Sequence, residues 1–439
     1  MRRHIQRVTQ MISCYLLEGK FEARTFEDFN EISRSINTYR EDLATMPIDA
    51  IINILDVLGK KVLQNQEINT FQGVSYISLW LRRENLDRLC QINYIDKRYL
   101  DGFFKDETNI LMAAQPRGII CQWIAANMPT LGFFSIVLAI ISKNGCIIKM
   151  PEEYVSLILT ILRELPKISV EFAGKTYSGK EILGAIAIVT FEGKAKNHSE
   201  DFSLVADCRI IFGGGEAVRA ISLLPCREHC ETIIFGPKYS FGVFDREYIE
   251  AEGFEKKLDL FVKDVAVFNQ MACSSPHVLF LENSRYPRDK IVQYIHDAFE
   301  RLPAALRNQE ISSGLSARII NARALYLLSD EKNCIAPKDL GWTILLNQDL
   351  CLEEPVQGKC IFIKEIPTVD EVIPLVNHKI QAISIGILDP VKREEFARKV
   401  SYRGADRIVV PGTIHDFILP WDGILTLNRL VRWVILRNN

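Results

Sequence analysis

Cys273 stands out among the eleven cysteines of this 439-residue chain because its neighbours suit a reacting thiol. It lies in the segment FNQMACSSP, between Ala272 and the polar pair Ser274 and Ser275, just before an apolar run. A thiol reacts as its thiolate, so a nucleophilic cysteine needs nearby donors or positive charge that lower its pKa from about 8.5. Most free cysteines are instead small buried apolar residues. The segment predicts a nucleophile on a tight turn, with a structural thiol as the alternative.

Three consecutive glycines, Gly213, Gly214 and Gly215, predict a second place where chemistry can occur. The strand-like run 208–212 precedes them, and a helical pattern follows over 216–224. Glycines at such a joint let a ligand approach the backbone, and the amides at a helix start attract phosphate. A sharp turn without a ligand is the alternative, since three glycines by themselves are a weak motif.

A third cluster of reactive residue types is Cys226, His229 and Cys230 in the segment CREHC. A structural zinc site needs a second pair of ligands at a similar spacing, and none follows here. The sequence therefore predicts no metal site. His277 and His415 lie near other motifs, but isolated histidines are more often structural, and no catalytic role is predicted for them.

The composition excludes several functional classes. Charged residues make up 25% of the chain and apolar residues 48%, with a net charge of -2. No basic excess points to a nucleic acid or to an anionic membrane surface. The cysteines show no regular spacing in a long chain, which favours reduced thiols and a cytoplasmic location over a disulfide framework.

The apolar region 118–142 is long enough to cross a bilayer, but polar residues and a proline divide it. Gln122, Asn127 and Pro129 leave only 131–141 continuous. A strand, a turn and a buried helix fit this pattern better than a membrane span. The first residues, MRRHIQRVTQMISCYLLEGKFEA, predict an amphipathic helix, because polar residues interrupt the apolar ones and no cleavage site follows.

The chain divides into a helical start and two α/β series. Apolar residues recur at helical spacing up to about residue 110, and strands then alternate with helices, which predicts parallel sheets with crossover connections. We expect a dinucleotide-binding domain with its helices over residues 1–245, a catalytic domain over 246–420, and a segment 421–439 that packs on the first domain or at a subunit interface. The predicted strands cover 118–123, 146–150, 185–190, 208–212, 277–281, 342–347 and 359–363.

Four segments in this order resemble the aldehyde dehydrogenase superfamily, and within it the acyl-CoA reductases typified by the fatty acid reductase of bacterial bioluminescence (LuxC type). They are QPRGIICQWIAANMPTLGFFSIVLAIISKNGCIIKMP, DCRIIFGGGEAV, FNQMACSSP and GADRIVVPGTIHDFILPWDG. The resemblance covers about residues 45–435. It implies an α/β fold, with a Rossmann-type cofactor domain and a second α/β domain that carries the nucleophile, and assembly as a homo-oligomer.

The resemblance also assigns roles to individual residues. Cys273 would accept the acyl group, and Asn127 would stabilise the oxyanion together with a backbone amide. The Gly213–Gly215 turn would hold the dinucleotide. Lys149 would contact the adenosine ribose, and Glu152 lies where NAD-preferring relatives hold a carboxylate. NADPH is the cofactor that the resemblance implies, and NADH stays open because of Glu152.

Two departures from the family pattern bear on the reaction. The oxidising dehydrogenases carry a glutamate that activates water, and Ile234 occupies the matching position. A missing base slows hydrolysis of an acyl-enzyme, which suits a reductase. Near Asn127, the residues Ala125 and Ala126 replace a glycine-containing loop, which leaves the shape of that loop open.

The sequence therefore predicts reduction of an acyl-CoA, or another acyl thioester, to an aldehyde through a cysteine acyl-enzyme. A partner synthetase or carrier protein is an alternative acyl donor. Reduction of an acyl phosphate and a non-catalytic acyl-binding subunit remain the competing functions. The length of the acyl chain cannot be predicted.

Overall fold

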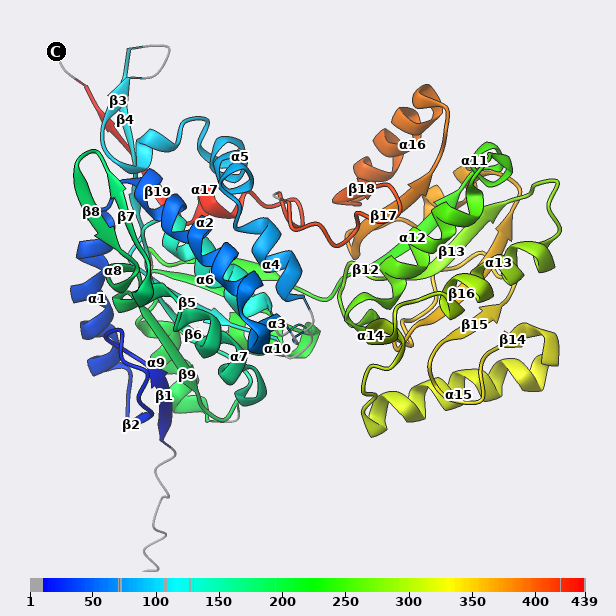
Figure 1. Ribbon diagram of the computed structural model, residues 1–439, viewed down its shortest axis with the longest axis horizontal. Coiled ribbons are helices and arrows are strands. Elements are labelled where there is room, and N and C mark those ends of the chain that lie inside the picture. The colour runs from blue at the N-terminus through cyan, green and yellow to red at the C-terminus, as the bar shows by residue number, and fades with distance from the viewer. Residues whose placement is uncertain are drawn as a thin grey trace, which may run out of the picture. The chain divides into compact units, whose positions relative to one another are not determined.

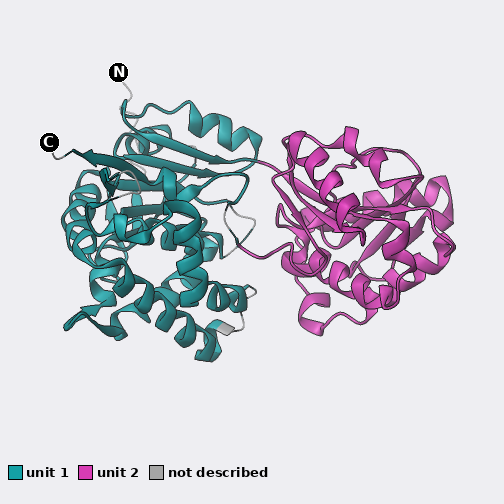
Figure 2. Cartoon of the chain, turned by 90° about the horizontal axis from the view of Figure 1, so that it is seen from above, with its two compact units in different colours: residues 1–236, 418–439 teal, residues 237–417 magenta. Residues whose placement is uncertain are grey.

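The computed structural model describes residues 11–69, 71, 73–105, 109–125, 128, 130–193, 195–418 and 420–437. The chain forms two compact units (Figure 2). Unit 1 combines residues 1–236 with 418–439, and unit 2 is the continuous segment 237–417. Each unit contains a largely parallel sheet between helices (Figure 1).

The sheet of unit 1 has seven strands in the order β11-β10-β5-β6-β9-β1-β2. The first five are parallel, and every residue of β5 is buried, as expected for a parallel strand covered on both faces. The strands are β5 Ile119–Trp123, β6 Gly145–Lys149, β9 Ile186–Thr190, β10 Cys208–Phe212, β11 Glu231–Phe235, β1 Ile12–Leu16 and β2 Arg24–Phe26.

Helices cover both faces of this sheet. Side chains of α1 and α9, such as Ile36 and Phe202, pack with Cys121 and Trp123 of β5. Gln122 points to the opposite face, where its amide nitrogen donates to the backbone oxygen of Ser135 on α6, at 3.3 Å. The helices of unit 1 are α1 Asn30–Thr45, α2 Ile48–Gln64, α3 Gln66–Asn69, α4 Val74–Trp80, α5 Arg83–Tyr94, α6 Leu131–Ile141, α7 Glu152–Leu162, α8 Gly179–Gly184, α9 Lys196–Leu204, α10 Gly215–Ser222 and α17 Thr426–Arg429.

The prediction of an amphipathic helix at the start of the chain is wrong. Residues 1–10 lie outside the described part, and Ile12–Leu16 forms strand β1, antiparallel to β9. Buried Ile12, Cys14 and Leu16 alternate with half-buried residues, which is the period of a strand with one covered face. Five residues are too few to separate this period from a helical one when basic residues precede them.

A smaller three-stranded sheet of unit 1 joins distant parts of the chain. β4, Leu111–Pro116, lies between β3, Phe104–Lys105, and β19, Val431–Leu436, with both pairs antiparallel. The buried hydroxyl of Tyr94 adds a second link, since it donates to the backbone oxygen of Leu427 at 2.9 Å. A separate hairpin pairs β7 Ser169–Phe172 with β8 Lys175–Ser178.

Unit 2 contains a seven-stranded sheet in the order β14-β15-β16-β13-β12-β17-β18. Only the edge strand β14 is antiparallel to its neighbour. The strands are β12 Tyr239–Phe244, β13 Pro276–Glu282, β14 Cys334–Ile335, β15 Thr343–Leu346, β16 Cys360–Ile366, β17 Ile380–Gly386 and β18 Arg407–Val409. The helices are α11 Arg246–Glu250, α12 Phe254–Ala266, α13 Arg288–Glu300, α14 Ala304–Arg307, α15 Ser313–Ser329 and α16 Pro390–Tyr402.

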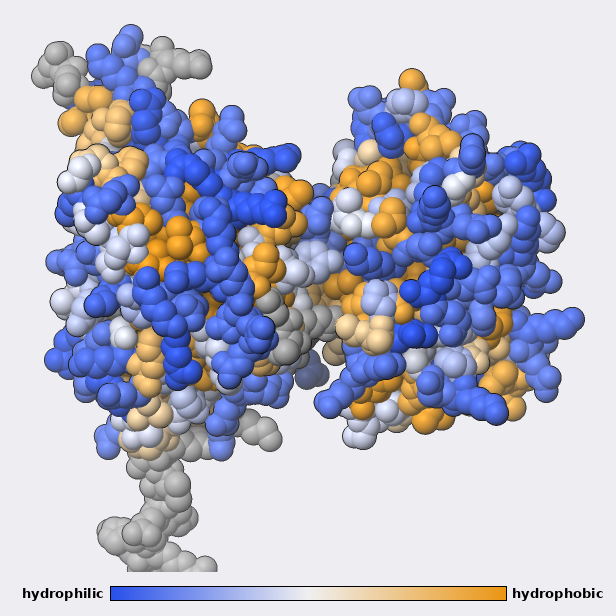
Figure 3. Space-filling view, in the orientation of Figure 1, coloured by the Kyte–Doolittle hydropathy of each residue, from blue (hydrophilic) through white to orange (hydrophobic). Residues whose placement is uncertain are grey.

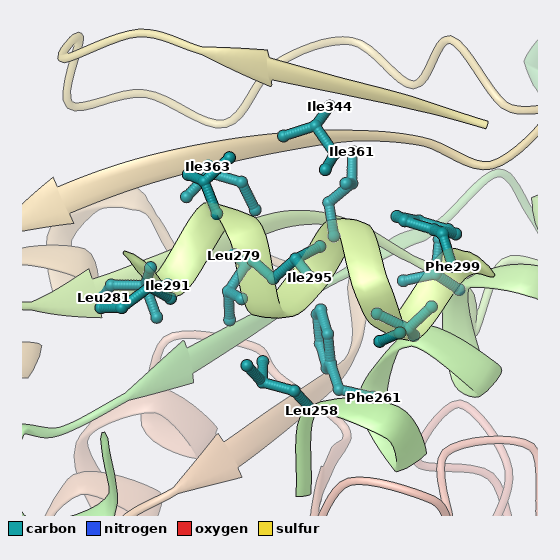
Figure 4. Close-up of a cluster of buried hydrophobic side chains, with 14 of the residues drawn as sticks. Leu258, Phe261, Leu279, Leu281, Ile291, Ile295, Phe299, Ile344, Ile361 and Ile363 are labelled. Atoms are coloured by element: carbon teal, nitrogen blue, oxygen red, sulfur yellow. The ribbon is translucent and has the colours of Figure 1, made fainter. Parts of the chain in front are cut away.

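The core of unit 2 has one layer on each face of the sheet. On one face, α12 and α13 pack against β13, β15 and β16, with Ile295 and Phe261 directed toward Leu279 (Figure 4). Phe280 and Phe362 point to the other face, where Phe396 of α16 packs with them. The sheet is thus held between two layers of helices, which fixes the positions where its strands begin.

The observed elements confirm the α/β prediction and most predicted strands to within two residues. Residues 118–142 form β5 and α6, as expected. Within the described ranges, no helix is both long and apolar enough to cross a bilayer. Hydrophilic residues predominate on the face of both units seen in Figure 3, with hydrophobic residues in small groups among them.

Candidate active site

Burial separates Cys273 from most of the other cysteines. All eleven are described, and they are thiols rather than disulfides. Six are buried, and burial raises the pKa of Cys146 to about 12 and that of Cys14 to about 11, which makes their thiolates scarce at neutral pH. Cys273 is half-buried, so it is not enclosed in the core as those six cysteines are.

The backbone before Cys273 adopts a strained conformation. Phe268, Asn269 and Gln270 have φ values of 54°, 51° and 60°, so three consecutive non-glycine residues are left-handed. Each such residue costs of order 1–3 kcal/mol and persists only where its surroundings hold it. A second left-handed run, 357–359, lies against the first, because the amide of Gly358 donates to the backbone oxygen of Asn269 at 3.1 Å.

Gln270 fixes the first run to the sheet. Its side-chain nitrogen donates to the backbone oxygens of Pro276 and Cys360 at 2.8 and 2.9 Å, and its side-chain oxygen accepts from the amide of Cys360 at 2.8 Å. The side chain is fully buried. Gln270 therefore joins the starts of the neighbouring strands β13 and β16, where buried backbone groups would otherwise lack partners.

Two further side chains hold the turn. The Ser240 hydroxyl donates to the backbone oxygen of Cys273 at 2.8 Å. The buried ammonium of Lys359 donates to the side-chain oxygen of Asn269 at 2.8 Å, and burial lowers the pKa of Lys359 to about 8. The amide of Ser275 closes a turn by donating to the oxygen of Ala272 at 3.0 Å. The backbone around Cys273 is thus held by side chains from distant segments of unit 2.

His415, which the sequence analysis left without a role, also lies at this turn. Its Nδ1 is 3.0 Å from the Ser274 hydroxyl, and its Nε2 is 2.7 Å from the backbone oxygen of Asp264. The only sequence signal was its position inside a segment that resembles the family. Ser240, Gln270 and Lys359 were missed as well, because their partners lie far away in the sequence.

In unit 1 the predicted cofactor residues lie at the carboxyl edge of the sheet. Strand β5 has β6 on one side and β10 on the other, so the strand order reverses between β5 and β10. Ligands of open parallel sheets bind outside the carboxyl ends of the strands at such a reversal. The glycine turn follows β10 and Lys149 ends β6, two strand spacings away, or about 10 Å.

The glycine turn leaves space at the start of α10. Gly214 precedes the first residue of the helix, and a Cβ added there would meet nothing within 4 Å. Its φ of -69° is open to any residue, so neither packing nor the backbone demands glycine here. The amides of the first helical turn have no intrahelical partner. Gly214 and the start of α10 therefore fit a negatively charged ligand that approaches the backbone closely.

Lys149 and Glu152 lie on either side of the loop between β6 and α7. Lys149 is half-buried with its Nζ 5.7 Å from the ring centre of Phe191, and burial lowers its pKa. Glu152 is exposed at the first residue of α7 and accepts a hydrogen bond from the Tyr15 hydroxyl at 3.2 Å. The structure brings both residues to the same edge of the sheet as the glycine turn.

Two other predicted positions have different outcomes. Asn127 lies outside the described residues, as does Ala126, so its role stays a prediction. Ile234 lies on β11 beside Ile211 of β10, with 38% of its surface exposed. An apolar side chain there cannot remove a proton from water.

The CREHC segment has a structural partner. Arg227 donates to a carboxylate oxygen of Asp207 at 3.0 Å, and His229 lies 3.1 Å from the same oxygen. The other oxygen of Asp207 accepts from the amide of Ile119, so this cluster anchors the start of β5. In the part of the chain that the structure describes, no group of three or more His, Cys, Asp or Glu residues is arranged to hold a metal ion.

Comparison with known sequences gives a consistent result. The sequence profile of a family described as acyl-CoA reductase (LuxC) matches residues 43–433. The long-chain acyl-protein thioester reductase of Vibrio harveyi is 24% identical, over 99% of this chain and 93% of that protein. The protein of the same name from Aliivibrio fischeri is also 24% identical, but the match spans 73% of this chain and 64% of the length of that protein.

Solved structures with the same fold are aldehyde dehydrogenases. An NADP-dependent glyceraldehyde-3-phosphate dehydrogenase from Bacillus halodurans, solved with NADP, has a TM-score of 0.70 at 12% identity and covers 97% of this chain and 95% of its own. An acetylating aldehyde dehydrogenase from Geobacillus thermoglucosidasius has a TM-score of 0.61 at 14% identity, over 92% and 96% of the two chains. At these identities, the likeness establishes the fold.

Proposed function

Because this chain belongs to the acyl-CoA reductase (LuxC) family, we propose that it reduces an acyl thioester to an aldehyde, with a reduced nicotinamide nucleotide as the hydride donor. The observation that carries the proposal is the turn at Cys273, whose strained backbone is held by buried hydrogen bonds. A half-buried thiol next to a strained backbone, held by side chains from distant segments, is the arrangement expected of a nucleophile.

In the proposed reaction the Cys273 thiolate attacks the carbonyl carbon of the thioester and displaces the donor thiol. The tetrahedral oxyanion is stabilised by the backbone amide of Cys273 and, by resemblance, by the side chain of Asn127. One such donor contributes about 3 kcal/mol to the transition state. Hydride addition to the resulting acyl-enzyme gives a thiohemiacetal on Cys273, which releases the aldehyde and restores the thiol.

The cofactor assignment is supported by the open space at Gly214 and by the strand reversal at β5 and β10. The glycine turn would hold the diphosphate, and Lys149 and Glu152 would face the adenosine ribose. The bound nucleotide supplies the hydride. The resemblance to the family implies NADPH, whereas the exposed carboxylate of Glu152 would oppose a 2'-phosphate and favours NADH.

Ile234 supports reduction over hydrolysis. An acyl-enzyme that waits for hydride is lost whenever a base activates water beside it. The apolar, partly exposed side chain of Ile234, at the position where the oxidising relatives carry glutamate, provides no such base.

The acyl donor is the finer part of the proposal. The relatives are named long-chain acyl-protein thioester reductases, so a long acyl chain on a partner protein is the leading donor, and acyl-CoA is the second. The proposed protein donor implies a partner that presents the acyl group as a thioester. Assembly as a homo-oligomer stays a prediction from the resemblance.

The test is a cofactor-oxidation assay with acyl-CoA and acyl-protein donors of several chain lengths, using NADPH and NADH side by side. We expect aldehyde and oxidised cofactor in equal amounts with a thioester donor. Turnover only with acyl phosphates would replace the proposal by its relative, an acyl phosphate reductase. A stable acyl adduct on Cys273 without cofactor oxidation with any donor would indicate a binding subunit instead.

A further inference from the structure

Residues 268–274, which lead to Cys273 and the residue after it, are called the nucleophile turn below. The ring of His415 contacts this turn at both of its ends. Its Nδ1 lies 3.0 Å from the hydroxyl oxygen of Ser274, the residue after Cys273. Its ring also meets Phe268, the first residue of the left-handed run, edge to face with 5.7 Å between ring centres. One side chain, 141 residues beyond Ser274 in the sequence, thus spans the whole turn.

The hydrogen bonds of His415 define how its ring is protonated. A backbone oxygen only accepts, so the contact of 2.7 Å to Asp264 assigns the proton to Nε2. Burial lowers the pKa of His415 to about 4, which keeps the ring neutral at physiological pH. Nδ1 is then an acceptor, and the Ser274 hydroxyl donates to it. Both residues are buried, so their hydrogen bond is shielded from solvent.

The segment that carries His415 is itself held firmly. The carboxylate of Asp264, in the last turn of α12, accepts from the amide of Gly412 at 2.6 Å. The buried guanidinium of Arg407 donates to the backbone oxygens of Ile414 and Asp416 at 3.1 and 3.0 Å. The bonds of the segment to α12 and β18 fix the position of His415, so the contact with Ser274 can transmit that position to the turn.

We propose that His415 is a positioning residue that sets the backbone of the Cys273 turn through its hydrogen bond to Ser274. The backbone amide of Cys273 must face the developing oxyanion, and a displacement of about 1 Å in such a donor can cost about 100-fold in rate. Ser240 holds the carbonyl side of Cys273, and His415 holds the following residue. The inference rests on the proposed role of Cys273 as the acyl acceptor.

The kinetic test compares four variants. Ser274→Ala removes the donor and leaves the bond of His415 to Asp264 intact, whereas His415→Phe removes the acceptor and keeps an aromatic ring against Phe268. We expect each to lower kcat about tenfold with KM within about twofold. The double variant should be no slower than His415→Phe, because the bond between Ser274 and His415 is already absent in that single variant. His415→Asn, whose Oδ1 replaces Nδ1, should recover most of kcat. The inference would be overturned if the losses in kcat of the two single variants multiplied in the double variant. An unchanged kcat in Ser274→Ala, or no recovery of kcat in His415→Asn, would overturn it as well.

A second measurement does not depend on turnover. Hydrogen exchange of the amides over 268–275 should become about tenfold faster in Ser274→Ala and His415→Phe, while exchange in β13 stays slow. The matched control is Ser384→Ala on β17, a buried serine whose hydroxyl has no partner among the described residues. It should leave both exchange and kcat unchanged. Unaltered exchange in Ser274→Ala would overturn the inference, whereas a wild-type protein without turnover would overturn only the proposed function.

Discussion

The two parallel sheets carry their candidate site residues at opposite ends of their strands. In unit 1, the glycine turn and Lys149 lie at the carboxyl ends of β10 and β6. In unit 2, Cys273 and Lys359 lie just before the amino ends of β13 and β16. At the first edge, helix α10 begins directly after the glycine turn and presents its free backbone amides there. At the second edge, a strand follows Cys273 instead of a helix.

This difference explains how each site is built. At the glycine turn, an open space and a helix start would be sufficient, because in the proposed site the backbone itself binds the ligand. At the nucleophile turn, the strained backbone has to be held by Gln270, Ser240 and His415. A backbone site of the first kind tolerates sequence change outside its glycines, whereas a side-chain site of the second kind depends on each of its partners.

Loss of the thiol is the largest change that this comparison predicts. Cys273→Ala should lower thioester reduction at least about 10³-fold, because the covalent step is lost. Cys226→Ala, at an exposed thiol of unit 1, is the matched control and should retain activity within about twofold. Cofactor oxidation and aldehyde formation measure both. A Cys273→Ala protein with more than about a tenth of wild-type activity would exclude the acyl-enzyme.

Gln270→Ala tests whether side chains hold the nucleophile turn. It leaves the amide of Cys360 and two buried carbonyl groups without their partner, so we expect a loss of about 3 kcal/mol in the free energy of unfolding. Gln293→Ala, on the exposed face of α13, should change it by less than about 0.5 kcal/mol. Trp342 is the single tryptophan in the sequence of unit 2, so its fluorescence reports urea unfolding of that unit once the other four tryptophans of the chain are replaced by phenylalanine. If Gln270→Ala and Gln293→Ala lowered the free energy of unfolding equally, the hydrogen bonds of Gln270 would not be what holds the turn.

Acid should weaken unit 2 through His277. Burial lowers its pKa from 6.5 to about 3, so below pH 6.5 the unfolded chain binds a proton that the folded chain does not. The free energy of unfolding then falls by up to about 1.4 kcal/mol per pH unit between pH 6.5 and 3. His415 acts in the same direction, and Asp264, whose pKa is raised to about 7 by burial, acts against it.

The difference between wild type and His277→Leu isolates one of these groups. Urea unfolding followed through Trp342 should show a shallower acid slope in the variant, because the other groups titrate equally in both proteins. Parallel curves for the two proteins would mean that His277 is protonated in the folded state.

Gly214→Val tests the open space of unit 1. The new side chain fits the fold but occupies the space at the helix start, so KM for the reduced cofactor should rise about tenfold with little change in stability. Gly145→Ala is the opposite case, since its Cβ would lie 2.4 Å from Ile36, and it should lower stability without changing KM. Steady-state kinetics and thermal unfolding separate the two. A Gly214→Val enzyme with an unchanged KM for the reduced cofactor would show that the cofactor does not bind at this turn.

Glu152→Gln should have the smallest effect. Removing one exposed carboxylate near a 2'-phosphate relieves a repulsion of about 1 kcal/mol, so the ratio of kcat/KM for NADPH over NADH should rise about fivefold. Glu153→Gln, the exposed neighbour, should leave the ratio unchanged. A shift in the control of the same size would show that only the general charge of α7 matters.

Local patterns made much of this fold predictable. The buried strands β5, β6 and β10 are short apolar runs between turn residues, and the helices between them carry apolar residues at helical spacing. β1 was not predicted, since its alternation covers only five residues and depends on pairing with β9, in which Cys14 lies opposite the distant Val189.

The candidate site divides in the same way. Cys273 and the glycine turn could be predicted because each is one continuous segment with a distinctive composition. The partners that hold Cys273 could not, since Ser240 and Gln270 act through contacts whose other halves lie 33 and 90 residues away. Nothing in the local sequence of His415 distinguishes a ring that binds Ser274 from any other buried histidine.

The pairing of β19 with β4 has a consequence for biosynthesis. β19 follows unit 2 in the chain, although it completes a sheet of unit 1. A ribosome therefore delivers all of unit 2, a continuous segment that can collapse as it emerges, before the last strand of unit 1 exists. During that interval the edge of β4 has no β19 to cover it, and an uncovered strand edge is a site of aggregation. Unit 1, although most of it is synthesised before unit 2, would therefore be the unit that needs chaperones for longer.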